Sequence, residues 1–502
     1  KYKKLLYEYT VKLRCALKKE KERHLHDFLS NLTPTDQTDY ALWKATKNIN
    51  RPIQYESPIR LGNGNWARTD SEKGCVFAEH LQSVFTPNQS SATTCLPLDI
   101  LQPPKKPIKF KKNNIVSVIN QLKPKKAPCY DKITPKMLKE LPNIAVLHIR
   151  HIFNAISRTA YYPKAWKLSQ IIMIGKPGKD LSQASSYRPI SLLSILSKLF
   201  EKLLLQKIMP FIQDNNIIPQ HQFGFRAKHS TTEQVHRIVS FIRKSFEKNQ
   251  YCTALFLDVA QAFDKVWHRG LIHKITSLLP TNVHLLLQNY ITNREFVVKQ
   301  KDFFSRHCRI DAGVPQGSVL GPILYVLYTS DMPTTSQTMT STFADDTAIL
   351  CTHTDPKVAT SILQRHILET EVWLKNWRIK VNETKCVHIT FTLRKETCPA
   401  VTINGQNIPQ QNEIKYLGIH LDRRLTWRNH IEKKVPNIKL KMKSLYWMLN
   451  SKSALPLEYK VLLYKAMLKP IWTYGIEMWG TATPSNIEKL QRVQSKALRI
   501  IT

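Results

Sequence analysis

The chain has 502 residues and 42% of them are hydrophobic, which is enough for several domains with packed cores and excludes wholesale disorder. Lysine and arginine number 75 against 37 acidic residues, a formal net charge of +38, and an excess of this size is expected of a protein that binds a polyanion. The basic residues are spread along the whole chain rather than gathered on one amphipathic segment, which favours nucleic acid over an anionic membrane.

Cysteine usage and the first residues bear on the compartment of the protein. The nine cysteines form no Cys-x-x-Cys pair and no Cys/His ligand spacing, so we predict neither a zinc site nor a disulfide framework, and a reducing compartment fits. The chain opens with Lys1 and no signal-peptide core follows, which we interpret as a piece of a larger open reading frame. The uncharged run 312–330 has an apolar part of only about ten residues, too short for a bilayer, and we expect a buried segment there.

The N-terminal part, 1–108, is predicted to be a helical basic extension followed by a linker. Residues 1–30 are rich in lysine and carry Leu6, Tyr9 and Leu13 at helical spacing, which indicates an exposed basic helix. Prolines and small polar residues between 87 and 108 indicate a linker, so we place the first domain boundary there.

Between 109 and 424 helical and strand periods alternate, which predicts an α+β domain. We expect a turn and a short helix within 120–139, a strand over 166–174 and a helix that runs through Leu205. Further on, we expect a helix that carries Ala359 to Trp377, a strand over 387–391 and a hairpin over 413–422.

Carboxylates stand at the ends of two apolar strands in this region. Asp258 ends the run 252–258, and Asp345 and Asp346 lie between two short apolar strands. If the two segments pair in one sheet, Asp258 and Asp345 converge, and the repulsion between them favours a bound cation. Oxygen ligands suit Mg²⁺, and two ions could serve phosphoryl transfer. Acidic pairs at turns are commonly only solvated, so this pattern alone leaves that alternative open.

A glycine cluster lies between the carboxylates in a chain with only 14 glycines. The segment 313–317 has the sequence G-V-P-Q-G, which predicts a backbone that approaches something closely, or else a tight turn before a buried helix.

The last part, 425–502, is predicted to be a separate helical module. Apolar residues step by three and four from Ile431 to Leu449, which indicates a helix–helix packing seam. Thr483 and Pro484 have the character of a helix start, and we expect a last helix over 487–501.

Three segments together resemble the catalytic motifs of reverse transcriptases in order and spacing. They are F-L-D-V-A-Q-A-F-D-K-V-W-H over 256–268, G-V-P-Q-G-S-V-L-G-P-I-L-Y over 313–325 and F-A-D-D over 343–346. The segments Y-R-P-I-S-L-L-S, F-G-F-R and Y-L-G-I-H-L-D are similar to non-LTR (LINE-type) retrotransposons, closest to the jockey-like group. The resemblance implies a right-hand polymerase fold with fingers, a palm built on an antiparallel sheet and a helical thumb.

The resemblance also implies roles for single residues. Asp258 and Asp345 would be the main metal ligands, with the carbonyl group of Val259 assisting and Asp346 beside the primer end. Phe263 would be a steric gate below the sugar of the nucleotide. Gln316 and Gly317 would contact the nucleotide and the template base, Arg188 and Lys176 would bind the triphosphate, and Lys385 would be a general acid for the pyrophosphate. Tyr416, Leu417 and Gly418 would form the primer grip. The residues implied to contact the nucleic-acid backbone are Lys433, Lys434, Lys439, Lys441 and Lys443.

Several alternatives stay open at this point. Lys385 could be a solvated lysine and Tyr416 a core aromatic residue. Cys129 stands where the family usually has glycine, and a glycine there would tolerate a positive φ that cysteine does not favour. An RNA-dependent RNA polymerase is the first competing class, although Phe263 argues against it. A catalytically dead scaffold that only binds nucleic acid is the second.

The resemblance finally implies partners and a location. We expect an RNA template, a DNA primer or target, deoxynucleoside triphosphates and two Mg²⁺ ions, with Mn²⁺ as a possible substitute. A ribonucleoprotein with the RNA of its own element, located in the cytoplasm and the nucleus, is expected, and no membrane partner. Residues 1–108 show no convergent carboxylate–histidine pattern, so we expect the nuclease of such an element to precede Lys1.

Overall fold

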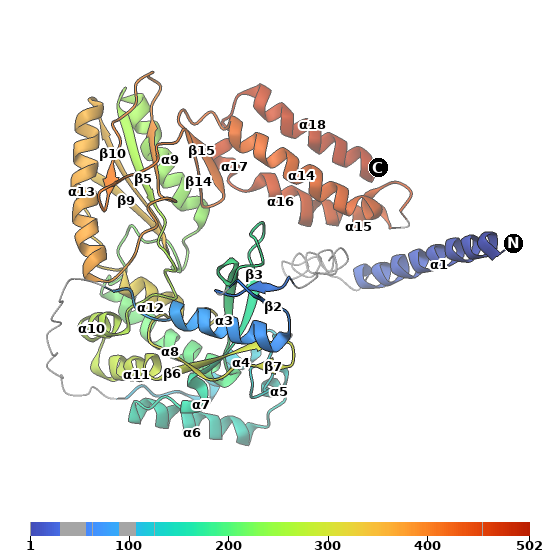
Figure 1. Ribbon diagram of the computed structural model, residues 1–502, viewed down its shortest axis with the longest axis horizontal. Helices are drawn as coiled ribbons and strands as arrows, with labels where there is room; N and C mark the ends of the chain where they lie inside the picture. The colour runs from blue at the N-terminus through green and yellow to red at the C-terminus, as the bar shows by residue number, and fades with distance from the viewer. Residues whose placement is uncertain (1, 31–56, 63, 90–106, 125, 454) are drawn as a thin grey trace. The chain divides into compact units, whose positions relative to one another are not determined.

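The computed structural model describes residues 2–30, 57–62, 64–89, 107–124, 126–453 and 455–502 (Figure 1). These residues divide into two compact units. We call them the central unit, which comprises the described residues within Glu56–Gln234 and Phe241–Gln411, and the C-terminal unit, which comprises the described residues within Lys1–Tyr55, Val235–Ser240 and Asn412–Thr502. The functional domain boundaries predicted at 108 and 424 stay predictions.

A four-stranded antiparallel sheet of the central unit has the order β11-β5-β10-β9. Its strands are β5 (Tyr251–Leu257), β9 (Thr338–Phe343), β10 (Asp346–His353) and β11 (Val387–Phe391). All seven residues of β5 are buried, as an apolar run in the middle of a covered sheet requires. Helix α13 (Pro356–Asn376) covers one face of this sheet (Figure 1), and Leu363 and Ile367 pack against its strands.

A second sheet of the central unit has the order β4-β3-β6-β7, with β8 also paired to β6. Its strands are β3 (Leu168–Gly175), β4 (Tyr187–Leu192), β6 (Arg294–Gln300), β7 (Phe303–Phe304) and β8 (Cys308–Ile310). Strands β3 and β6 are parallel and the other pairs are antiparallel. Helix α3 (Asp70–Val84) begins at a capping box of Thr69 and Glu72 and packs Phe77 and Leu81 onto this sheet.

Most of the remaining helices of the central unit enclose a large apolar core. The remaining helices are α4 (Lys112–Asn120), α5 (Pro135–Lys139), α6 (Asn143–Thr159), α7 (Lys164–Lys167), η1 (Ala184–Ser186), α8 (Ile195–Asp214), α9 (Thr231–Glu247, whose middle belongs to the C-terminal unit), α10 (His268–Leu278), α11 (Thr281–Ile291) and α12 (Gly321–Tyr328). Helices α9 and η1 do not contribute to this core. Two small hairpins complete the unit: β1 (Ile59–Arg60) with β2 (Trp66–Ala67), and β12 (Thr402–Ile403) with β13 (Gln406–Asn407). Helix α12 is almost entirely buried, which confirms the prediction for 312–330.

The C-terminal unit combines a hairpin with helices. Its elements after Asn412 are β14 (Glu413–Tyr416), β15 (Ile419–Asp422), α14 (Arg428–Leu449), α15 (Leu457–Leu463), the π-helix η2 (Tyr464–Leu468), α16 (Lys469–Thr473), α17 (Ile476–Trp479) and α18 (Pro484–Ile501). The carboxylate of Asp422 accepts hydrogen bonds from the backbone of Thr426 and Trp427, both at 2.9 Å, and so fixes the start of α14. Helices α14 and α18 pack together, and the predicted seam is confirmed because Ile431, Ile438, Met442, Leu445 and Leu449 are buried.

The predicted N-terminal helix is confirmed as α1 (Tyr2–Ser30), whose described side chains are nearly all exposed. Most of the linker predicted over 87–108 lies outside the described residues. Among the helices that the structure describes, none combines the length and the apolar character that a bilayer crossing needs.

Candidate active site

The predicted carboxylates come together at one end of the first sheet. Strands β5 and β10 are antiparallel with Leu257 opposite Thr347, so Asp258 follows β5 where Asp346 begins β10. Asp346 also pairs with Phe343 of β9, which leaves Ala344 and Asp345 as a two-residue turn. The predicted pairing of the two segments is therefore confirmed.

The turn that carries Asp345 is held by Gln222. The side-chain oxygen of this buried glutamine accepts hydrogen bonds from the backbone N–H groups of Ala344 (3.0 Å) and Gly224 (2.7 Å), and its amide nitrogen donates to the carbonyl oxygen of Ala344 (3.5 Å). A Cβ atom at Gly224 would lie 2.2 Å from the amide nitrogen of Ala344. Only glycine allows this approach, so the F-G-F-R segment positions the turn.

The loop between α13 and β11 holds Asp258 from the other side. The carbonyl oxygen of Asp258 accepts from the backbone of Asn382 (2.8 Å), and its N–H group donates to Sγ of Cys386 (3.4 Å). Lys385 lies on the same loop, and its Nζ is 3.6 Å from Oδ2 of Asp258. The side chains of Lys385 and Asp258 are 64% and 44% exposed, so this ion pair contributes little to stability, and its significance is that it places Lys385 beside Asp258.

The carboxylates at this corner affect one another. Burial and then the charge of Asp258 raise the pKa of Asp345 above its ordinary value, although its own backbone N–H opposes this. Desolvation raises the pKa of Asp346 to about 6, with the charges of Asp345 and Asp258 as further causes. A cation between the carboxylates would relieve this repulsion.

The donor set fits a hard divalent cation that takes part of its ligands elsewhere. No group of three or more His, Cys, Asp and Glu side chains in the described ranges is arranged to hold a metal ion by itself. Mg²⁺ needs only one or two protein carboxylates when substrate phosphates and water complete its shell. Asp258 and Asp345 supply that number, with oxygen ligands only.

The G-V-P-Q-G segment makes its close approaches to the protein backbone. Gly313 and Gly317 both have positive φ, and a Cβ atom would lie 2.7 Å from the carbonyl oxygen of Asp264 or 2.6 Å from that of Ser191, respectively. The Gln316 side chain donates to Oδ1 of Asp264 (2.8 Å), and the backbone of Ser191 donates to the carbonyl oxygen of Gln316 (3.0 Å). The two glycines therefore lock this loop between Asp264 and strand β4.

Three cations gather near this loop. Burial lowers the pKa of Lys176, and the positive charges of Arg188 and Lys385 lower it further. Lys176 follows β3 and donates to the carbonyl oxygen of Ser185 (2.7 Å), while Arg188 stands opposite Ile174 on β4 and is exposed. The structure thus brings the predicted triphosphate residues Lys176 and Arg188 to the same end of the β3–β4 pair, and the charge of Lys385 also acts on Lys176.

Phe263 lies next to the carboxylate corner. Its ring stacks on Tyr325 with centroids 4.6 Å apart, and the ring of Phe225 meets it edge-on at 6.0 Å. Tyr325 lines one small cavity together with Val259 and Ala344, the chain neighbours of Asp258 and Asp345, and burial followed by the charge of Asp345 raises the pKa of this tyrosine. Phe263 itself is half-buried.

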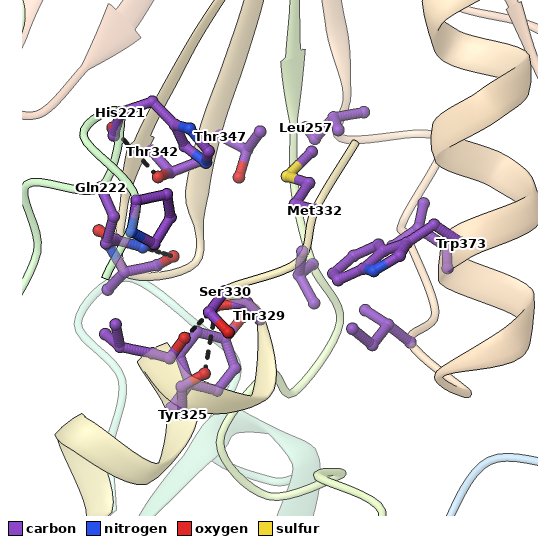
Figure 2. Close-up of a pocket in the computed structure, with 16 residues that line it drawn as sticks. His221, Gln222, Leu257, Tyr325, Thr329, Ser330, Met332, Thr342, Thr347 and Trp373 are labelled. Carbon is purple, nitrogen blue, oxygen red and sulfur yellow. Dashed lines mark hydrogen bonds between the residues drawn. The ribbon is translucent and has the colours of Figure 1, made fainter. Parts of the chain in front are cut away.

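A small cavity lies behind the carboxylates. Figure 2 shows Tyr325, Thr329 and Ser330 below it, His221 and Gln222 on one side, and Met332 and Trp373 on the other. Its volume of about 30 Å³ corresponds to about one water molecule, so it is a packing gap and not a nucleotide site.

Three buried polar residues support the site although none of them was predicted from the sequence. Gln222 holds the Asp345 turn, and Asp264 holds Gln316. Glu201 of α8 accepts from the backbone of Val319 (2.8 Å) and Leu320 (3.2 Å), just after the G-V-P-Q-G segment. Two of the three had a signal, since Asp264 lies within the first catalytic segment and Gln222 directly precedes F-G-F-R. Glu201 had none.

The concern about Cys129 is not borne out. Cys129 is absent from the residues with positive φ, so its backbone does not require glycine. Its side chain is buried and Sγ donates to the carbonyl oxygen of Leu192 at 3.0 Å. The turn takes its positive φ at Lys132 instead, so the alternative of an unfavourable backbone at Cys129 does not apply.

The predicted primer-grip residues belong to the C-terminal unit. Leu417 and Gly418 form the two-residue turn of the β14–β15 hairpin with positive φ at both positions, as a type I′ turn requires. The hydroxyl group of Tyr474 donates to the carbonyl oxygen of Leu417 (2.6 Å). Tyr416 is only 4% exposed, as the core-aromatic alternative expects.

The five predicted backbone-binding lysines all lie on α14. Lys433 pairs with Glu413, and burial is the first cause that lowers the pKa of both Lys434 and Lys441. Lys439 and Lys443 are exposed. Lys433 is therefore the least suited of the five to contact a phosphate.

Comparison with known proteins agrees with the motifs. The family model described as reverse transcriptase (RNA-dependent DNA polymerase) matches residues 174–421. The probable RNA-directed DNA polymerase from transposon X-element of Drosophila melanogaster is 39% identical over 98% of this chain and 55% of its own length. The probable RNA-directed DNA polymerase from transposon BS of the same species is 39% identical over 99% of this chain and 57% of its own length. The RNA-directed DNA polymerase from the mobile element jockey of that species is 37% identical over 97% of this chain and 55% of its own length.

The chain spans about half the length of the curated relatives it matches. Among solved structures, apo telomerase from Candida tropicalis is similar at a TM-score of 0.38 and 14% identity, covering 69% of this chain and 66% of that chain.

Proposed function

We propose that the chain is the RNA-directed DNA polymerase of a non-LTR retrotransposon of the jockey-like group, because residues 174–421 match the reverse transcriptase family model and the jockey polymerase is 37% identical to the chain. Its reaction would be nucleotidyl transfer to the 3′-hydroxyl of a primer, directed by the RNA of the element. The observation that carries the proposal is the convergence of Asp258 and Asp345 at the ends of adjacent strands, beside the cation cluster of Lys176, Arg188 and Lys385.

Asp258 and Asp345 are proposed to hold a divalent cation, with Asp346 at the primer end and the carbonyl group of Val259 as a further ligand. Bound Mg²⁺, as two ions, would lower the pKa of the primer 3′-hydroxyl and stabilise charge on the pyrophosphate. The raised pKa values of Asp345 and Asp346 support this role, because like charges held together favour a cation. Mn²⁺ has the same preference for oxygen ligands and would substitute.

The cation cluster is proposed to bind the triphosphate. Arg188 is exposed and presents a planar fork of donors, while Lys176 supplies a point charge beside it. Lys385 lies 3.6 Å from Asp258, where it could protonate the leaving pyrophosphate. Its alternative role is to neutralise Asp258 while the cation site is empty.

Phe263, Gln316 and Gly317 are proposed to select the nucleotide. The stacking of Phe263 on Tyr325 fixes the ring that would exclude a 2′-hydroxyl group. The hydrogen bond from Gln316 to Asp264 fixes the loop that would face the nucleotide and template base. The same gate argues against an RNA-dependent RNA polymerase.

The other partners are proposals of the same kind. The template RNA, the DNA primer and a ribonucleoprotein with the RNA of the element follow from the relatives and from the charge of +38. Lys434, Lys439, Lys441 and Lys443 would contact the nucleic-acid backbone, and the hairpin at Tyr416 would grip the primer. A location in the cytoplasm and nucleus would accompany these partners.

Primer extension tests the proposed function. The purified chain, an annealed DNA primer on an RNA template and Mg²⁺ are combined with deoxynucleotides or with ribonucleotides. We expect extension with deoxynucleotides only, and none when EDTA removes the metal. Extension with ribonucleotides would favour an RNA polymerase, and RNA binding without extension under either condition would favour the dead scaffold.

A further inference from the structure

A polar hollow of about 540 Å³ opens at the start of strands β3 and β6 in the central unit. Four cations line it: Lys164, Lys167, Arg294 and Arg309. The eight residues of β3 separate it from Lys176, which corresponds to about 25 Å at roughly 3.3 Å per strand residue. We call it the basic hollow, and the polymerase centre does not account for it.

Arg294 is a buried charge at the floor of the basic hollow, with 1% of its surface exposed. Its Nη1 donates to the carbonyl oxygen of Tyr290 (3.2 Å), and the guanidinium lies 4.9 Å from the ring of the same tyrosine. Among the described residues, Nε and Nη2 have no hydrogen-bond partner. A buried guanidinium with two free donors is costly unless an acceptor reaches it, directly or through water.

The other charged side chains of the basic hollow do not neutralise the positive charge of Arg294. Lys167 is 7% exposed, and burial followed by the charges of Arg294 and Lys164 lowers its pKa. Glu295 and Asp311 also line the hollow, but within the described ranges no ion pair joins either carboxylate to Lys167 or Arg294. Glu295 instead contacts Nδ1 of His307 at 3.1 Å. The hollow therefore has room and positive charge for an anion.

We propose that the basic hollow binds a phosphate-bearing nucleotide unit of an RNA strand, at a place separate from the polymerase centre. Its volume lies within the range of about 300–1,000 Å³ that is common for ligand sites. The half-exposed ring of Tyr161 offers a stacking surface for a base, and Asn289 and Asn293 offer amide groups. The identity of the strand as RNA rests on the proposed function, while the phosphate chemistry rests on the hollow alone.

The test removes two cations from the rim of the basic hollow. Lys164 and Arg309 are exposed, so Lys164→Ala with Arg309→Ala leaves the buried floor intact. The matched control is Lys357→Ala with Arg365→Ala, which removes two exposed charges from α13. Fluorescence anisotropy measures the binding of a 30-nucleotide single-stranded RNA without primer over a series of salt concentrations. Melting curves verify the fold of each variant.

We expect the rim variant to bind this RNA roughly tenfold more weakly at 0.15 M salt, with a salt slope lower by about 1.4, since each single-strand phosphate contact contributes about 0.7. The control should keep the wild-type slope. Equal losses in both variants would overturn the proposal, because any two charges would then serve.

Two further measurements are made. One distinguishes binding of RNA from binding of a free phosphate, and the other distinguishes a failure of this proposal from a failure of the proposed polymerase function. Calorimetric titration with inorganic phosphate and with AMP identifies a small-anion site. If the rim variant loses that binding while its RNA affinity stays unchanged, the RNA assignment is overturned. Primer extension by the wild-type chain is measured in parallel, so a failure of the proposed polymerase function appears there and leaves the RNA-binding comparison intact.

Discussion

At the end of the first sheet that carries Asp258 and Asp345, buried polar side chains hold single backbone groups by hydrogen bonds. In the C-terminal unit, apolar side chains instead pack two helices together and lysines lie on the exposed face. Gln222 fixes both backbone groups of Ala344, and Glu201 fixes the segment after Gly317. In the C-terminal unit, Ile438 and Met442 are buried while Lys439 and Lys443 are exposed. Hydrogen bonds to single backbone groups suit a reaction that depends on precise positions of the carboxylates. Packed helices with exposed lysines suit the attraction of a phosphate backbone, which needs less precise positions.

The largest expected effect comes from Asp345→Asn. It removes a proposed metal ligand without disturbing a core contact, so primer extension should fall by at least about a thousandfold while template binding stays nearly intact. The control is Asp302→Asn, an exposed aspartate between β6 and β7, which should extend primers at the wild-type rate. A well-folded Asp345→Asn protein that retained more than a tenth of the rate would rule out this assignment.

Gly224→Ala tests whether the backbone contacts of the turn matter by themselves. The new methyl group would displace Ala344, and a shift of about 1 Å at the turn should lower kcat about a hundredfold with little change in primer–template affinity. Gly62→Ala is the control, because no atom lies within 4 Å of its Cβ position and its φ is ordinary. A normal kcat in Gly224→Ala would show that the turn does not need Gln222 and Gly224 to position Asp345.

Phe263→Val should change selectivity more than rate. We expect the ratio of ribonucleotide to deoxynucleotide incorporation to rise about tenfold or more, since the gate acts by collision with the 2′-hydroxyl group. A purely structural phenylalanine would instead only lower the melting temperature, at a cost of up to about 3–5 kcal/mol. Phe304→Val serves as the control, because Phe304 is exposed on strand β7. An unchanged ratio of ribonucleotide to deoxynucleotide incorporation in a stable Phe263→Val protein would show that Phe263 does not act as a steric gate.

A change at Asp264 tests the buried support through pH. Burial raises the pKa of Asp264 from 3.8 to about 6, so its ionisation opposes folding, and the free energy of unfolding falls as the pH rises from about 3.8 to about 6 and then levels off. Asp264→Asn removes this loss, so the variant should gain on the wild type by up to about 3 kcal/mol between pH 4 and pH 8. Urea unfolding at several pH values measures the difference. If the difference in free energy of unfolding between Asp264→Asn and the wild type does not change with pH, the pKa of Asp264 is not raised by burial.

The smallest and most distributed effect is expected on α14. Neutralising Lys439, Lys441 and Lys443 together should lower the salt slope of primer–template binding by up to about three units, alike for different template sequences. Neutralising Lys3, Lys4 and Lys12 of the exposed helix α1 removes the same charge and serves as the comparison. An unchanged slope in the α14 variant would show that those lysines only face solvent.

The sequence predicted the apolar framework of the site better than its polar supports. The convergence of Asp258 and Asp345 could be predicted because two apolar runs of strand length pair in one sheet and carry their acids at its end. The contact between Gln222 and Ala344 joins residues 122 positions apart through a backbone group, and no side-chain pattern encodes a backbone acceptor. The concern about Cys129 shows the converse, since a family glycine need not mark positive φ.

The central claim, that Asp258 and Asp345 together hold a divalent cation at the polymerase centre, is tested most directly by Mn²⁺ titration followed by electron paramagnetic resonance. The sample contains primer, RNA template and a non-hydrolysable deoxynucleotide, and the chain is wild type, Asp258→Asn, Asp345→Asn or the Asp302→Asn control. The account predicts tight Mn²⁺ binding to the wild type and the control, and at least about a tenfold loss in each of the other two variants. Equal Mn²⁺ affinity in all four proteins would contradict it.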